Sequence, residues 1–291
     1  MRKILLTGCS GQLGHALQAE YGDEVKFILT DMAGVIDNVP GGIALDISDA
    51  AQVHDLVMSE RPDVIINCAA ITNVDGCETN YDAAYRVNAL GPRNLAASAN
   101  DINAKLIHIS TDYVFSGTDP NPMTESEIPD PISAYGQSKL AGEQYVRQFS
   151  NRWFMLRTAW LYGEGKNFVQ TMLRLSETHD EVSVVNDQFG SPTSAVELAR
   201  VIHRLEPTTC YGLYHATCEG QVCWADFAMK IFELAGKSTR VIPISSMEYK
   251  KRNPESAARP PFSILENEML RMNGFPPMQD WEAAIVEYFS R

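Results

Sequence analysis

The stretch TGCSGQLG at residues 7–14 decides the fold, because three glycines follow a short apolar run and precede a helical pattern. Lys3–Thr7 has the apolar character of a buried strand, and Gln12–Glu20 has the pattern of a helix. Glycines such as Gly8 and Gly11 permit a tight turn and let a pyrophosphate approach the backbone. The following helix start offers unpaired N–H groups to the same anion. The position of the motif between strand and helix therefore predicts a dinucleotide-binding loop.

The next 150 residues repeat this strand and helix alternation. Four further strands are apolar throughout, and three more helical segments separate them. The predicted strands are Val25–Asp31, Val64–Asn67, Lys105–Ser110 and Trp153–Arg157, and the helices are Asp49–Glu60, Tyr81–Asn100 and Tyr135–Phe149. Unbroken apolar strands joined by helices are typical of a parallel sheet covered on both faces. We therefore predict an α/β protein with a doubly wound, Rossmann-type sheet.

The alternation loosens beyond about residue 160. Helices are predicted over 167–177, 194–205, 224–235 and 281–289, with short strands over 182–185 and 212–216. A proline-rich stretch before the last helix reads as irregular. We expect residues 1–162 to form a dinucleotide-binding domain, completed by residues 192–217. Residues 163–191 and 218–291 are then the smaller substrate-binding part, placed over the strand ends where such sheets bind ligands.

The composition excludes several classes of function. The 291 residues carry 24 Lys+Arg and 37 Asp+Glu, a formal net charge of −13, which opposes binding to nucleic acid. No apolar run approaches the ~18 residues of a membrane span, and the first residues lack the pattern of a signal peptide. The six cysteines and six histidines show no metal-site spacing. We expect a cytoplasmic protein with free thiols and no bound metal.

Two acidic positions fit the adenosine end of a dinucleotide. Asp31 ends the second predicted strand, where a carboxylate accepts hydrogen bonds from a ribose. The same charge repels a 2′-phosphate, which mildly favours NADH over NADPH. Asp46 and Ile47 precede the next helix and suit a loop beside the adenine, although Asp46 is equally suited to capping a turn.

A second constellation points to proton transfer. Tyr135 and Lys139 form Y-x-x-x-K, and a spacing of four places both side chains on one helix face. A tyrosine hydroxyl can donate a proton to a carbonyl oxygen, and a nearby ammonium eases its release. Ser110 and Thr111 end the fourth predicted strand, where a hydroxyl can polarise the same carbonyl.

These motifs together resemble a known family over nearly the whole chain. They are TGCSGQLG (7–14), NCAAITNVDGCE (67–78), RVNALGPRNLA (86–96), STDYVFSG (110–117), YGQSK (135–139), RTAWLYG (157–163), NDQFGSPT (186–193) and ARPPFSIL (258–265). The set resembles the extended short-chain dehydrogenase/reductases and, among them, the dTDP-4-dehydrorhamnose reductases. STDYVF, RTAW and DQFGSPT discriminate within the superfamily, whereas the glycine loop and Y-x-x-x-K are common to it.

The resemblance implies a role for each matching position. Tyr135 would be the general acid, Lys139 would bind the nicotinamide ribose, and Thr111 would be the third catalytic hydroxyl. Asp112 and Trp160 would contact a dTDP-sugar. The cofactor, NADPH or NADH, would be bound by Tyr135 and Lys139 together with Gly8, Gly11, Gln12, Leu13, Asp31, Asp46, Ile47, Ala69, Ala70 and Ile71. The resemblance also implies that Asn88 supports the surroundings of Lys139.

The implied activity is reduction of the 4-keto group of dTDP-4-dehydro-L-rhamnose to dTDP-L-rhamnose, by a monomer or homodimer. The chain departs from the family at Gly76, where lysine is usual, and at Phe262, where asparagine is usual. The first helix has His15 and Ala16 where an interface metal would need a carboxylate. Reduction of another 4-keto-6-deoxy sugar nucleotide, and a non-catalytic cofactor-binding regulatory subunit, remain alternatives.

Overall fold

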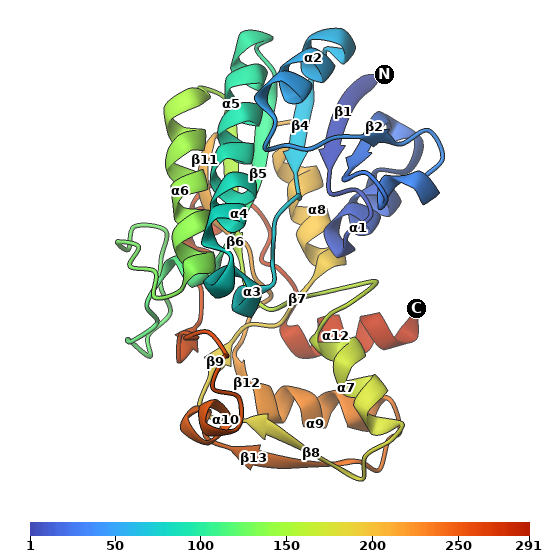
Figure 1. Cartoon of the computed structure of the whole chain (residues 1–291). Coiled ribbons are helices and arrows are strands. Elements are labelled where there is room, and N and C mark those ends of the chain that lie inside the picture. Colours follow the sequence, from blue (N-terminus) through green and yellow to red (C-terminus); the bar gives the residue numbers. More distant parts are fainter.

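A seven-stranded sheet organises the computed structural model, which describes residues 1–291 (Figure 1). The strand order is β11-β6-β5-β4-β1-β2-β3, and every neighbouring pair is parallel. The strands are β1 (Arg2–Thr7), β2 (Val25–Asp31), β3 (Ile43–Ala44), β4 (Val64–Asn67), β5 (Lys105–Thr111), β6 (Trp153–Thr158) and β11 (Gly212–His215). The predicted doubly wound sheet is confirmed. The order reverses between β1 and β4, and a crevice opens there at the carboxyl ends.

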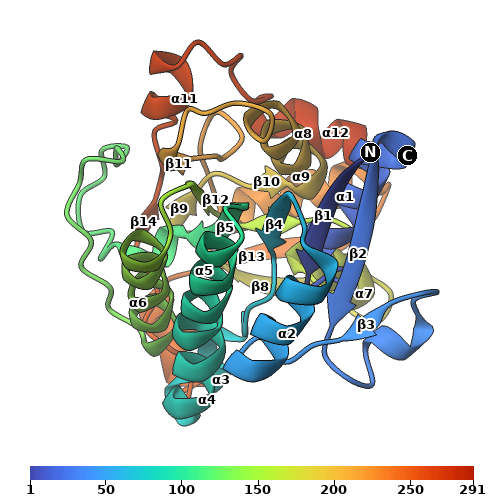
Figure 2. The ribbon, with the colours of Figure 1, turned by 90° about the horizontal axis from the view of Figure 1, so that it is seen from above.

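Helices cover both faces of this sheet (Figure 2). One face carries α1 (Gln12–Tyr21) and α8 (Ala195–Leu205), and the other carries α2 (Ala50–Glu60), α5 (Gly91–Asp101) and α6 (Ala134–Phe149). Alternate strand residues point to opposite faces, which explains why successive residues such as Leu5 and Leu6 are both apolar and buried.

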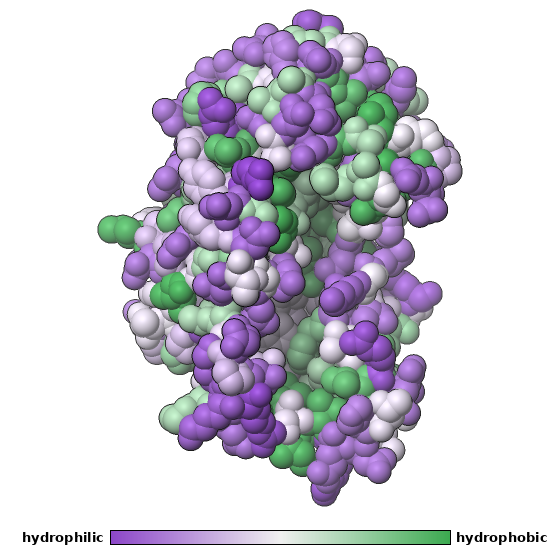
Figure 3. All heavy atoms as spheres, viewed as in Figure 1, coloured by the Kyte–Doolittle hydropathy of each residue, from purple (hydrophilic) through white to green (hydrophobic).

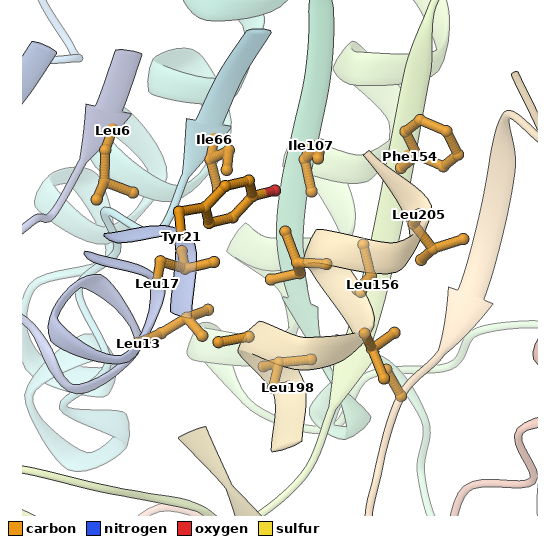
Figure 4. Packing of buried hydrophobic residues seen from close by; sticks show 14 of the residues in the cluster. Leu6, Leu13, Leu17, Tyr21, Ile66, Ile107, Phe154, Leu156, Leu198 and Leu205 are labelled. Atoms are coloured by element: carbon orange, nitrogen blue, oxygen red, sulfur yellow. The ribbon is translucent and has the colours of Figure 1, made fainter. Parts of the chain in front are cut away.

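The packing of the first face is visible in Figure 4. Leu6, Ile66, Ile107 and Phe154 extend from the strands toward leucines of α1 and α8. The neighbouring residue Leu5 belongs to the cluster on the opposite face. The two cores hold the carboxyl ends of β1, β4 and β5 at one edge of the sheet.

The predicted helix over residues 81–100 is three segments in the structure. These are α4 (Tyr81–Tyr85), a π-helical turn (Arg86–Leu90) and α5, preceded by α3 (Val74–Thr79). Pro92 lacks the N–H that would bond to the Asn88 carbonyl in an α-helix, which favours the wider turn. The Asn88 side chain fixes this turn by accepting from the Ile71 N–H at 2.9 Å and donating to its carbonyl at 3.0 Å.

The C-terminal part lies below the sheet in Figure 1 and has its own apolar core. Its helices are α7 (Phe168–Ser176), α9 (Trp224–Leu234), α10 (Ser246–Arg252) and α12 (Trp281–Ser290), whereas α11 (Glu268–Met272) packs on the core of the main sheet through Leu270. Short strands complete it: β7 (Leu161–Tyr162) with β10 (Thr193–Ser194), β8 (Glu181–Val185) with β13 (Arg240–Ile244), and β9 (Phe189–Gly190) between β12 (Val222–Cys223) and β14 (Phe262–Ser263).

The proline-rich stretch is therefore more regular than predicted, since it contains β13, α10, β14 and α11. Pro243 fits inside β13 because this strand pairs only with β8, so the missing N–H can lie on the free edge. Separately, none of the helices combines the length and apolarity that crossing a membrane requires.

Candidate functional site

A cavity of about 790 Å³ lies between the carboxyl edge of the sheet and the C-terminal part. Figure 3 shows the molecule hollowed along this boundary. Every residue predicted to bind cofactor or substrate, or to act in catalysis, lines this one cavity: Gly8, Gly11, Gln12, Leu13, Asp31, Asp46, Ile47, Ala69, Ala70, Ile71, Thr111, Asp112, Tyr135, Lys139 and Trp160. Residues far apart in sequence meet there because parallel strands end at the same edge.

The glycine loop has the shape that a pyrophosphate requires. Gly8 has φ +66°, and a Cβ there would lie 2.9 Å from the backbone nitrogen of Ala69. Helix α1 begins immediately after Gly11, whose position as N-cap brings no side-chain hydrogen bond. The first N–H groups of α1 are therefore free for an anion, and the helix dipole favours one there. This cradle fits a dinucleotide cofactor.

The two acidic positions behave differently. Asp31 accepts a hydrogen bond from the Ser10 N–H at 3.0 Å, so its carboxylate also holds the glycine loop. Asp46 accepts from the backbone N–H of Ser48 at 2.9 Å and from its hydroxyl at 2.8 Å. Asp46 thus caps a turn, as the alternative interpretation had it, while also lining the cavity.

Helix α6 presents the Y-x-x-x-K pair. The hydroxyl of Ser133 caps the helix by accepting from the Gly136 N–H at 3.1 Å. A Cβ on Gly136 would overlap the carbonyl oxygen of Tyr113, so glycine lets the first turn lie directly on that backbone. The ring of Tyr135 meets the ring of Tyr113 edge-on, with centroids 5.6 Å apart. These contacts fix where the Tyr135 side chain enters the cavity.

Tyr135 and Thr111 form a polar group with Asp112. Burial raises the pKa of Tyr135, and a hydrogen bond with the Thr111 hydroxyl opposes the shift. Thr111 also contacts the Asp112 carboxylate at 2.9 Å. Burial raises the pKa of Asp112 to about 6, the nearby hydroxyls of Ser263 and Thr111 oppose this shift, and the Oδ2 atom has no partner at full hydrogen-bond geometry. An unpartnered acceptor at a cavity wall fits a ligand hydroxyl.

Lys139 is buried one helical turn further along. Its Nζ donates to the carbonyl of Ile109 at 2.6 Å, which directs the ammonium to the end of β5. Burial lowers the pKa of Lys139 to about 8, against the opposing charge of Glu143. Ser110, the other hydroxyl that ends this strand, donates to Glu143 at 2.6 Å. The sequence could not distinguish Ser110 from Thr111, whereas the structure gives Ser110 a buried partner.

Trp160 takes a strained backbone conformation, with φ +47°. Its indole stacks on Trp224 with ring centroids 3.4 Å apart and planes 7° apart. A Cβ on Gly190 would lie 2.5 Å from the Trp160 indole, so glycine makes room for the ring. Both tryptophans line the cavity. The two residues are 64 positions apart, so no local sequence pattern indicates this stack.

The sequence patterns also did not predict that the loop over residues 163–167 belongs to the site. Asn167 donates to the side chain of Gln12 at 2.9 Å, which brings this loop over the start of α1. Lys166 lines the cavity there, and with Lys139 it supplies the two basic side chains of the lining. No motif marked this exposed loop, because its position depends on the contact with Gln12 rather than on local spacing.

Comparisons with known proteins agree with this geometry. The family model described as the RmlD substrate binding domain matches residues 1–291. A dTDP-4-keto-6-deoxy-D-glucose reductase from Streptomyces niveus is 40% identical over 288 residues, covering 98% of this chain and 96% of the relative.

Two solved structures are also similar. A dTDP-4-dehydrorhamnose reductase from Clostridium acetobutylicum has a TM-score of 0.92 and 43% identity, with 99% of this chain and 98% of that chain covered. One from Bacillus anthracis, in complex with NADP, has a TM-score of 0.91 and 42% identity, with 100% and 99% covered. The present chain therefore belongs to the family of the RmlD substrate binding domain.

Proposed function

We propose that this protein is an NAD(P)H-dependent reductase that converts the 4-keto group of dTDP-4-dehydro-L-rhamnose to the alcohol of dTDP-L-rhamnose. The product serves cell-surface polysaccharide synthesis. One observation carries the proposal: in a member of this family, Thr111, Tyr135 and Lys139 line the same cavity as an intact glycine loop. A non-catalytic regulatory subunit has no need to retain this complete set.

Each part of the cavity has a role in this proposal. Gly8, Gly11, Gln12 and Leu13 bind the cofactor pyrophosphate through backbone N–H groups. Asp31, Asp46 and Ile47 would hold the adenosine, and Ala69, Ala70 and Ile71 would line the rest of the cofactor site. Asp31 mildly favours NADH, whereas the Bacillus anthracis relative was solved with NADP. We therefore propose use of either reduced cofactor.

The reaction divides between the cofactor and this chain. The bound nicotinamide supplies the hydride to C4 of the sugar. Tyr135 delivers a proton to the forming alkoxide, and its raised pKa keeps it protonated at neutral pH. Thr111 hydrogen-bonds the same oxygen, and Lys139 holds the nicotinamide ribose. Asp112 accepts from a sugar hydroxyl through its unpartnered oxygen, and Trp160 borders the sugar.

The two parts of the chain bind different ligands. Residues 1–162 and 192–217 hold the cofactor, because β11 pairs with β6 in the main sheet. Residues 163–191 and 218–291 select the sugar, and they carry Trp224 on the cavity wall. We further infer a cytoplasmic monomer or homodimer, since six unpaired cysteines suit a reducing compartment.

The proposal is tested by following cofactor oxidation at 340 nm with the keto-sugar nucleotide. We expect oxidation of NADPH or NADH that depends on the sugar and saturates with it. A protein that binds the cofactor tightly but oxidises neither form with any 4-keto sugar nucleotide would instead fit the regulatory alternative.

A second candidate keeps the chemistry and changes the sugar. The Streptomyces niveus relative is named for a 4-keto-6-deoxy-D-glucose substrate. In this chain Phe262 replaces the usual asparagine and stacks on Phe189, with ring centroids 5.8 Å apart. Comparing turnover of dTDP-4-keto-6-deoxy-D-glucose with that of dTDP-4-dehydro-L-rhamnose separates the two candidates.

A further inference from the structure

A buried ion pair lies behind the candidate catalytic side chains. Glu143 on α6 and Arg157 on β6 each expose about 1% of their surface. The Arg157 guanidinium makes two bonds to the carboxylate, from Nε to Oε1 at 2.8 Å and from Nη2 to Oε2 at 2.7 Å. Neither residue lines the cavity. The geometry is that of a bidentate, charge-assisted pair, which is the most directional kind.

The pair itself joins α6 to β6, and Glu143 also joins α6 to β5, the strand that carries Thr111. Ser110 donates its hydroxyl to Glu143 Oε1 at 2.6 Å. One residue earlier, the Ile109 carbonyl accepts from Lys139 at 2.6 Å. Two successive residues of β5 are thus tied to two successive turns of α6. The next residue along the strand is Thr111, and the preceding turn of the helix carries Tyr135.

Burial makes the two charges of this pair costly to retain, and the Nη1 atom of Arg157 has no hydrogen-bond partner. The Phe115 ring, whose centroid lies 4.9 Å from the guanidinium, offsets part of this cost by a cation–π contact. Burial lowers the pKa of the neighbouring His215 to about 3, so its imidazole is neutral and places no second positive charge beside Arg157. Arg147 lies 3.9 Å from Glu143 at the exposed end. Apolar side chains often stabilise such a site at least as well as a buried pair does, which points to a role besides stability.

We propose that the Glu143–Arg157 pair is a positioning element of the reductase site. It holds α6 against β5 so that Tyr135 and Lys139 meet Thr111, and it places a fixed carboxylate one helical turn from Lys139. The inference rests on the proposed function and adds two residues that act through others, without touching cofactor or sugar.

The carboxylate also sets the charge that Lys139 faces. The ammonium faces Cys68 after β4, His108 on β5 and Glu143 on its own helix. Burial raises the pKa of the Cys68 thiol, so it carries no charge at neutral pH. Burial and the nearby Lys139 lower the pKa of His108, so its imidazole is neutral as well. Glu143, which is paired with Arg157, is therefore the acidic group that raises the pKa of Lys139, and its removal should lower that pKa further.

Three variants separate positioning from stability. Glu143→Gln leaves Arg157 buried and unpaired, and we expect Tm to fall by about 10 °C. The double variant Glu143→Gln with Arg157→Met removes both charges and should recover most of that Tm. Glu143→Asp keeps the charge on a shorter side chain. Glu206→Gln is the matched control, because Glu206 is a buried partner of Arg2 that does not line the cavity.

The readouts are Tm, kcat, KM and the pH dependence of kcat. In both variants that carry Glu143→Gln, the single and the double, we expect kcat to fall roughly tenfold to a hundredfold while KM changes little. The alkaline limb of the kcat–pH profile should move to lower pH. Glu143→Asp folds, keeps the limb in place and has an intermediate kcat. Glu206→Gln lowers Tm alone. Two results would contradict the proposal. One is a double variant in which kcat and the alkaline limb of the kcat–pH profile recover together with Tm. The other is a Glu143→Asp variant with unchanged kcat.

A second measurement does not need the sugar. Lys139 is proposed to hold the nicotinamide ribose, so the affinity for NADP⁺ should depend on pH, and tryptophan fluorescence measures it. We expect this dependence to shift to lower pH in both variants that carry Glu143→Gln and to stay unchanged in the control. Absence of sugar turnover by the wild-type protein would contradict the proposed function alone. An unshifted affinity profile would contradict the role of Glu143.

Discussion

Tyr135 is buried, which raises the pKa of its hydroxyl, and the neighbouring Thr111 hydroxyl opposes this shift. If it is the proton donor, Tyr135→Phe removes the proton while leaving the ring that packs against Tyr113. We expect kcat to fall by about 10²–10⁴-fold with cofactor affinity nearly unchanged. Steady-state kinetics and cofactor titration check this. Tyr85→Phe, which removes a hydroxyl bonded only to Tyr145, is the matched control and should keep wild-type turnover.

Asp112 gives the site a pH dependence of its own. Its pKa is raised to about 6 by burial, so the carboxylate is ionised above that pH and protonated below it. Because the unpartnered oxygen is proposed to accept from a sugar hydroxyl, KM for the sugar should rise as pH falls through about 6. The measurement is KM from pH 5 to 8. In Asp112→Asn the rise of KM at low pH should disappear, and KM should be high at every pH measured. A rise that persists in this variant would come from the titration of another group.

Residues at the site divide into those that local spacing could identify and those that it could not. Tyr135 and Lys139 were predictable because a spacing of four fixes their common helix face. The separation of Ser110 from Thr111 depends on Glu143, which comes from another element. The stack of Trp160 on Trp224 joins residues 64 positions apart, and no local pattern reports such a contact.

At the scale of elements, the glycine loop should tolerate no side chain at Gly8. A Cβ there would meet backbone atoms of Cys68 and Ala69 at 2.9–3.1 Å, and these residues directly follow β4. Gly8→Ala should therefore displace the loop and weaken cofactor binding by roughly tenfold or more. Titration with NADP⁺ measures the effect.

Gly236→Ala is the control for backbone strain in this experiment. Gly236 has φ +63°, close to the +66° of Gly8, but a Cβ there has no neighbour within 4 Å. Both variants carry the same conformational cost, and only Gly8→Ala adds the collision. Equal cofactor affinities in the two variants would show that the close approach to β4 is unimportant.

Element boundaries were predictable where the sequence carries its own signal. Val25–Asp31 and Val64–Asn67 match the observed strands because each contains a run of strand-forming apolar residues that the sheet buries at least in part. The interruption of the helix at residues 86–90 was not predictable, since it depends on the contact of Asn88 with Ile71. Pro92 was a local clue, but proline is also common in the first turn of a helix.

For the whole molecule, the net charge of −13 does not describe the cavity or its proposed anionic ligands. The lining itself has two lysines against Asp31, Asp46, Asp112 and Glu164. Backbone N–H groups at the start of α1 must then carry most of the phosphate recognition. Of the two lysines in the lining, Lys166 is the exposed one, so its charge can reach a bound ligand.

Lys166→Met tests this distribution of charge. A solvated contact to a phosphate is worth about 1 kcal/mol, so we expect affinity for NADP⁺ or for the sugar nucleotide to fall several-fold. The remaining binding should also depend less on salt. Titrations at two ionic strengths measure both effects. Lys237→Met removes an exposed charge that does not line the cavity and should change neither value.

The central claim is that this cavity transfers hydride to C4 of a dTDP-linked keto sugar. The most direct measurement uses NADPH deuterated at C4 of its nicotinamide, with dTDP-4-dehydro-L-rhamnose as substrate and NMR of the product. We expect dTDP-L-rhamnose with deuterium at C4 of the sugar when the transferred position carries the label. A sugar that neither NADPH nor NADH reduces at C4 would contradict the proposed reaction.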